Sequence, residues 1–137
     1  MHHLHFNLLA LFVSALIQWL IGGLWYSLLF KKQWIALTGY LRPEGGERSK
    51  GAVVGMTASF LISLILSLIL AHVVIWAGAD SFAHGVFIGF ICWLGFIAGP
   101  LLAQQIYEQR PMKLWAINAG YWLVAVLVSG GLLAVWR

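Results

Sequence analysis

Side chains suited to binding or catalysis are scarce in this chain of 137 residues, and they form two groups. The first consists of polar, aromatic and helix-breaking residues inside apolar stretches, namely Gln18, Trp25, Tyr26, Ser59, Pro100, Asn118 and Tyr121. Because Pro100 has no N–H, the Phe96 carbonyl needs another donor, and Asn118 and Tyr26 lie at a suitable depth if the stretches are helical. This polar layer predicts either a ligand pocket or a set of hydrogen bonds between helices.

The second group contains the histidines, which the sequence places at one end of the apolar stretches. Three precede the first stretch, one ends the second and one begins the third: His2, His3, His5, His72 and His84. Asp80 lies between the last two, and neutral imidazoles with a carboxylate suit Zn²⁺ or Cu²⁺. The candidate metal ligands are therefore His5, His72, Asp80 and His84. The alternatives are interfacial histidines that bind nothing, or a sensor of external pH, since imidazole titrates close to neutrality.

Several kinds of chemistry lack the residues they require. No Asp, Glu, Lys or Arg falls within the apolar stretches, which argues against carboxylate-dependent proton coupling and against intramembrane protease chemistry. The chain has no His-Glu-x-x-His, no Gly-x-Ser-x-Gly and no phosphate-binding loop, and Cys92 has no second cysteine for thiol exchange. We expect neither an enzyme nor a bound cofactor.

The elements that carry these residues follow from composition. Hydrophobic residues make up 62% of the chain and charged residues only 9%, whereas soluble domains average about 25% charged residues. The uncharged stretches exceed the length of about 20 residues that crosses a bilayer. We therefore predict an all-α, four-helix transmembrane bundle that forms a single domain over 1–137. Its spans are about 6–30, 52–77, 82–105 and 114–136, joined by cytoplasmic loops 31–50 and 106–113.

Charge predicts the orientation of the bundle. Of the eight Lys and Arg residues, all except Arg137 lie in the two loops after the first and third spans. The positive-inside rule then places both loops in the cytoplasm and both termini on the non-cytoplasmic side. This charge asymmetry suits topology and lipid headgroups rather than nucleic acid. Trp34, Leu37, Thr38 and Leu41 recur at helical spacing, which indicates a short interfacial helix after span one.

Small residues indicate how the spans pack. Ser59, Ser63 and Ser67 form a stripe on span two, and Gly-x-x-x-Gly motifs begin at Gly51, Gly85 and Gly95. Such motifs allow close helix contacts and predict a homo-oligomer. A weak internal similarity relates 19–29 to 93–102, each beginning Trp-Leu and ending Leu-Leu. It is explained either by a duplicated hairpin or by chance.

Short motifs distributed over the whole chain carry a resemblance to a known family. They are Trp25-Tyr26-Ser27, Lys32-x-Trp34, Ala71-His72, Arg110-Pro111 and Asn118-Ala119-Gly120-Tyr121. Together they resemble a bacterial family of small integral membrane proteins known only as a domain of unknown function. The resemblance implies four spans in a bacterial cytoplasmic membrane and supplies no activity. Leu28 stands where that family often has Pro, and Trp122 where it often has His.

These observations leave three functional hypotheses. The first is a non-enzymatic membrane protein that acts through helix–helix assembly or partner binding. The second is a small oligomeric channel or carrier for a small solute or metal, with Gln18, the serine stripe, Tyr26, Asn118 and Tyr121 lining a polar path. The third is a metal or pH sensor on the outer face.

Overall fold

Four long apolar helices make up the computed structural model, which describes residues 7–39 and 46–136, with side chains for all of these except 46–50 and 52. The helices that can cross a membrane are Leu8–Leu29, Val53–Trp76, Phe82–Tyr107 and Met112–Val135. Their length and hydropathy identify a multi-pass membrane protein. The prediction of an all-α chain with four apolar helices of spanning length is confirmed.

The first span consists of α1 (Leu8–Leu24) and a π-helical turn, η1 (Trp25–Leu29). Asn7 caps α1, because its side-chain oxygen accepts the N–H groups of Leu9 at 3.0 Å and Ala10 at 3.2 Å. Phe30 leaves the helical conformation, and the short helix α2 (Lys31–Thr38) follows at once. The predicted interfacial helix therefore begins earlier than its aromatic spacing suggested; Leu41 lies outside the described residues.

The second span belongs to α3 (Gly46–Trp76), which is longer than the sequence predicted. Residues 46–50 were expected in the loop and are instead the first turn of α3. The helix ends in a Schellman motif: the N–H of Gly78, at φ +70°, donates to Ile75 and that of Ala79 to Val74. Ser81 then caps the next helix by accepting the N–H of His84 at 3.1 Å, which completes a tight helical hairpin.

The third span is interrupted by a second π-helical turn. It runs through α4 (Phe82–Cys92), η2 (Trp93–Ala98) and α5 (Gly99–Tyr107). The N–H of Gly99 bonds to the Leu94 carbonyl, five residues back, immediately before Pro100. The wider π-helical turn accommodates Pro100, because in a regular α-helix the proline ring would clash with the carbonyl group four residues earlier. After a turn with Gln109 at φ 55°, α6 (Met112–Val135) begins behind Pro111.

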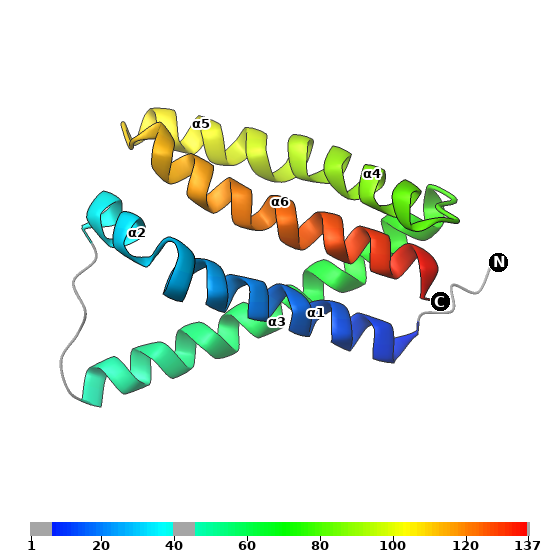
Figure 1. Ribbon diagram of the computed structural model, residues 1–137, viewed down its shortest axis with the longest axis horizontal. Helices are drawn as coiled ribbons and strands as arrows, with labels where there is room; N and C mark the ends of the chain where they lie inside the picture. Colours follow the sequence, from blue (N-terminus) through cyan, green and yellow to red (C-terminus); the bar gives the residue numbers. More distant parts are fainter. Residues whose placement is uncertain (1–6, 40–45, 137) are drawn as a thin grey trace.

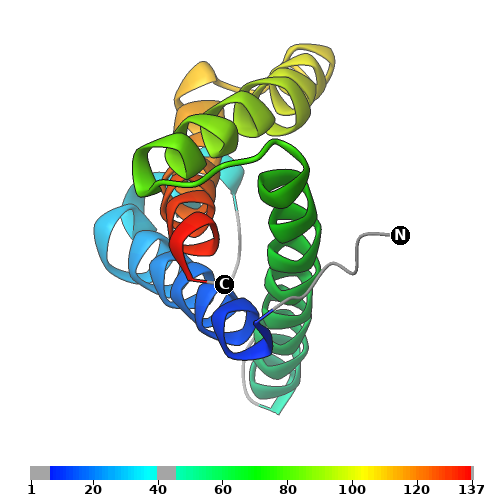
Figure 2. The same cartoon turned by 90° about the vertical axis from the view of Figure 1, so that its right-hand side faces the viewer.

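Helix α6 is the central element of the bundle. Half of its most apolar stretch, 50%, is buried inside the protein, compared with 11% for the third span. Figures 1 and 2 show α6 between α1 on one side and α4 and α5 on the other, with α3 crossing beside them. Helix α4 packs most extensively on α6, whereas α3 meets α4 only near their connecting turn. The beginning of α1 and the end of α6 lie at the same end, opposite α2 (Figure 1).

Glycines bring α4 and α6 into backbone contact. A Cβ atom at Gly85 would overlap the Gly130 carbonyl oxygen and lie 2.6 Å from the Ala134 Cβ. One turn later, a Cβ atom at Gly89 would lie 2.7 Å from the Val126 carbonyl oxygen. The Gly85-x-x-x-Gly89 motif is therefore used inside the protein, as the surface on which α6 packs.

Candidate functional site

Gln18 lies at the centre of a buried polar cluster that joins three helices. Its side chain is 0% exposed. Its Nε2 donates to Ser67 Oγ of α3 at 2.8 Å and to Ser129 Oγ of α6 at 2.9 Å. Ser67 Oγ in turn donates to Ser14 Oγ of α1 at 3.1 Å. This network cross-links α1, α3 and α6 through one amide.

The direction of the Gln18 amide follows from its partners. With Nε2 facing the serines, both N–H groups are used and only Oε1 has no hydrogen-bond partner. If the amide were turned by 180°, Nε2 would occupy the position of Oε1, and its two N–H donors would have no hydrogen-bond partner. Two unpaired donors cost more free energy than one unpaired acceptor. The Gln18 cluster is thus closed. Ser63 and Ser67 of the serine stripe are also buried within the chain.

A second hydrogen-bonded chain lies nearer to α2. Tyr26 Oη donates to Asn118 Oδ1 at 2.8 Å, and the rings of Tyr26 and Tyr121 meet edge to face, 5.6 Å apart. Tyr121 Oη donates to the Gln18 main-chain carbonyl at 3.1 Å. The structure therefore unites four residues of the predicted polar layer, on α1, η1 and α6.

Replacing Tyr26 by phenylalanine should reduce stability by about 1 kcal/mol, the size of one interhelical hydrogen bond. The change removes the hydroxyl donor to Asn118 Oδ1 and keeps the ring contact with Tyr121. Unfolding of the detergent-solubilised protein by sodium dodecyl sulfate, followed by helical circular dichroism, measures the loss. The matched control is Tyr107→Phe, at a residue that is 91% exposed. Equal losses for both variants would contradict the assigned hydrogen bond.

Tryptophan N–H groups fasten both π-helical turns to α6. Trp25 Nε1 donates to the Ile117 carbonyl at 2.9 Å, and Trp93 Nε1 donates to the Ala119 carbonyl at 2.8 Å. Each tryptophan is the first residue of its π-helical turn. Trp25 and Trp93 are thus equivalent in position. Trp19, which the internal similarity paired with Trp93, donates to the Met56 carbonyl of α3 instead.

Pro100 was placed at the depth of Tyr26 and Asn118, but it is not joined to their hydrogen bond. The Tyr26 hydroxyl donates to Asn118 rather than to the Phe96 carbonyl. Trp115 Nε1 donates to the Ala98 carbonyl at 3.1 Å instead. Pro100 lines a separate groove of about 260 Å³ between the third span, α3 and α6. Pro100 lies on the face of the third span that points away from η1. The depth of a residue in the membrane does not specify the face of the helix on which it lies.

A cleft between α1 and α3 holds the remaining layer residue, Ser59. This α1–α3 cleft has a volume of about 520 Å³ and is lined by both helices, by η1 and by Tyr121 of α6. The residues that line it include Tyr26, Ser27 and Ser59 and three glycines, Gly22, Gly23 and Gly55. Its volume falls within the range of about 300 to 1,000 Å³ typical of small-molecule sites.

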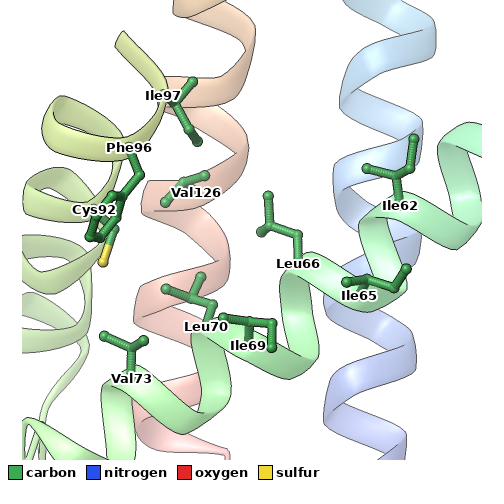
Figure 3. Close-up of a pocket in the computed structure, with 10 residues that line it drawn as sticks. All are labelled: Ile62, Ile65, Leu66, Ile69, Leu70, Val73, Cys92, Phe96, Ile97 and Val126. Carbon is green, nitrogen blue, oxygen red and sulfur yellow. The ribbon is translucent and has the colours of Figure 1, made fainter. Parts of the chain in front are cut away.

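A second hollow, the apolar groove, separates α3 from η2. It has a volume of about 390 Å³, and Figure 3 shows aliphatic side chains of α3 facing Cys92, Phe96 and Ile97 across it, with Val126 of α6 at the back. Its lining exposes no polar surface. The apolar groove therefore has no groups that could orient a polar ligand.

The two histidines in the described part of the chain, His72 and His84, have separate partners. His84 Nδ1 lies 3.7 Å from Asp80 Oδ1, whereas His72 Nδ1 lies 2.8 Å from the Leu68 carbonyl and its ring packs on Trp76. Within 7–39 and 46–136 no three His, Cys, Asp or Glu side chains are grouped to hold a metal ion. Of the predicted ligands in these ranges, His84 and Asp80 lie close together and His72 lies apart from them. His5 lies outside the described residues.

Sequence reasoning missed several residues that the structure places in these clusters. Ser14 is one helical turn before Gln18, so the spacing could have identified it. Trp93 could have been found from its place ahead of the Gly99-Pro100 break. Ser129 and Trp115 gave no such signal, since only the packing of α6 brings them to Gln18 and Ala98.

Residues 9–134 match the family described as "Protein of unknown function (DUF1761)", and the chain belongs to that family. This confirms the resemblance seen in the short motifs. No curated protein and no solved structure matches the chain.

Proposed function

We propose that this chain, as a member of a family without an assigned activity, is a non-enzymatic membrane protein that assembles with further copies of itself. Inside the protein, the amide of Gln18 and the hydroxyls of Tyr26 and Tyr121 are used to join helices. Polar side chains that bond to neighbouring helices stabilise the bundle as a scaffold. The function then lies on the outer surface of the bundle.

The observation that supports assembly is the outward face of the third span. A Cβ atom at Gly95 would meet nothing within 4 Å, and one at Gly99 would meet only Leu94 of its own span. Beside them, the Phe96 side chain is 79% exposed. Small residues flanked by large apolar ones form the surface on which membrane helices associate closely. Unlike Gly85, these glycines have no partner helix within the described part of the chain.

Orientation and location are part of the proposal. Helix α2 lies at the same end of the bundle as the α5–α6 connection (Figure 1). Lys31 and Lys32 begin α2, Arg110 lies in the connection and Lys113 in the first turn of α6. By the positive-inside rule this end faces the cytoplasm, and both termini face outward. The family resemblance supports a bacterial cytoplasmic membrane. Reporter fusions after Thr38 and at the C-terminus should report opposite sides; the same side for both would contradict this topology.

Transport and sensing are less well supported by the geometry. A path along span one would have to pass Gln18, which is fully buried and bonded to two other helices. A metal sensor would need a third ligand beside the His84–Asp80 pair. Assembly with further copies requires no rearrangement of the Gln18 cluster or of the His84–Asp80 pair.

Cysteine cross-linking in native membranes tests the assembly face. In a Cys92→Ser background, Phe96→Cys should form a cross-linked dimer, whereas Leu20→Cys, an exposed position on α1, should not. Adding Gly95→Leu should reduce the dimer about tenfold, which corresponds to a loss of about 1.4 kcal/mol. Cross-linking that is equal at both positions, or unchanged by Gly95→Leu, would exclude this face.

A further inference from the structure

The α1–α3 cleft has a shape suited to a chain-like apolar ligand. Helices α1 and α3 meet where Gln18 bonds to Ser67, and from there they diverge toward the end that carries α2 (Figure 1). The cleft occupies this divergence, from Trp19 near the middle of span one to Ser27 near its end. It is therefore an elongated slot that runs from the membrane centre toward one surface.

Glycine backbones keep the slot open. A Cβ atom at Gly23 or at Gly55 would meet nothing within 4 Å, although both residues line the cleft from opposite helices. The side chains of Leu20, Leu24 and Met56, each more than half exposed, border it. The slot is thus bordered by apolar side chains of the kind that face hydrocarbon.

The two tyrosine hydroxyls that line the cleft are committed to bonds within the protein. The Tyr121 hydroxyl donates to the Gln18 carbonyl and the Tyr26 hydroxyl to Asn118. These protons are therefore unavailable to a polar solute deep in the slot. An acyl chain needs no donor there, and the aromatic rings offer it a packing surface.

Two lysines begin α2, the helix that contacts the cleft residue Tyr26. Trp34 of α2 packs on Tyr26 with ring centroids 6.0 Å apart, and Lys31 lies one helical turn before Trp34. Lys31 and Lys32 are both exposed. At the end of the bundle that carries α2, the only carboxylate among the side chains described, Glu108, is paired with Arg110 at 2.8 Å. Paired lysines beside an apolar slot match a phosphate beside an acyl chain.

We propose that the α1–α3 cleft binds an anionic phospholipid of the leaflet next to α2, with one acyl chain between Gly23 and Gly55 and its phosphate at Lys31 and Lys32. The three features above each carry one part of this assignment. The glycines leave room for the chain, the committed tyrosine hydroxyls favour an apolar ligand over a polar one, and the exposed lysines select a negative headgroup. The site does not depend on the assembly face, which lies on the third span.

Native mass spectrometry of the detergent-solubilised full chain with phosphatidylglycerol tests the proposal. We expect one retained lipid per chain, and at least tenfold weaker retention of phosphatidylcholine with the same acyl chains. Gly23→Leu and, separately, Gly55→Leu place a side chain in the slot where there is room for it, and each should reduce retention at least tenfold. Unchanged retention in both variants would overturn the acyl-chain site.

Matched controls separate lipid binding from folding and assembly. Gly95→Leu adds the same side chain at an equally open position away from the cleft, and it should leave lipid retention intact while reducing the cross-linked dimer. The double variant Lys31→Gln, Lys32→Gln should weaken phosphatidylglycerol binding about tenfold, whereas Lys113→Gln should not. Equal binding of the two lipids by the wild-type chain would overturn the selection of an anionic headgroup, and equal loss in Gly95→Leu and Gly23→Leu would overturn the cleft.

Discussion

Gly85→Val should separate α4 from α6 and remove about 3 kcal/mol or more of stability, the upper range for overpacking a core. The added Cβ would overlap the Gly130 carbonyl oxygen and lie 2.8 Å from its carbonyl carbon. Both atoms belong to the backbone, so no side-chain rotation relieves the overlap. The helices themselves must move apart, and the contacts along the most extensive interface of the bundle are lost with them. Dodecyl sulfate unfolding, followed by circular dichroism, measures the change.

Gly95→Val is the matched control for this prediction. It makes the same substitution in the same span, at a position where the new Cβ meets nothing within 4 Å. We expect a change below about 1 kcal/mol, because the new side chain overlaps nothing and valine has a higher helix propensity than the glycine it replaces. The measurement is made at a dilution where the protein is monomeric, so that assembly does not contribute. If Gly85→Val were as stable as Gly95→Val, the close approach of α4 and α6 would be refuted.

Gln18→Ala should have the second largest effect, a loss of about 2 to 4 kcal/mol. The substitution removes the two hydrogen bonds that reach Ser67 and Ser129 and leaves a cavity at a fully buried position. The three helices then lose their shared cross-link. The same unfolding assay reports the loss.

Gln18→Met separates the hydrogen bonds from the packing. Methionine fills a similar volume without donors, and it also removes Oε1, which has no partner in the wild-type protein. Removing that unsatisfied acceptor offsets part of the cost, so we expect a loss of only about 1 kcal/mol. The order of stability should be wild type, then methionine, then alanine. A methionine variant as unstable as the alanine variant would show that hydrogen bonding dominates; an alanine variant as stable as wild type would contradict the buried cluster.

The spans could be recognised from the amino-acid sequence because hydropathy and helix caps are local. The uncharged stretches matched the four long helices, and Gly78, Ser81 and Pro111 ended or began helices where their backbone preferences predict. Depth was also accessible, since a constant helical rise converts position into height in the membrane. That is why Tyr26 and Asn118, on different spans, were placed at one level and do form a hydrogen bond.

Rotation of each helix about its axis, and the order of the helices around the bundle, came from tertiary packing. Gly85 and Gly95 belong to the same kind of motif on one span, yet only Gly85 faces α6. Likewise Pro100 shares the depth of Asn118 and faces a different groove, and His72 lies apart from the His84–Asp80 pair. These directions depend on contacts between residues far apart in the chain. These helices are apolar on nearly all sides, so their sequences contain too little amphipathic contrast to predict which face packs on a neighbour. Only the assembled bundle determines which face of each helix contacts another helix and which contacts lipid.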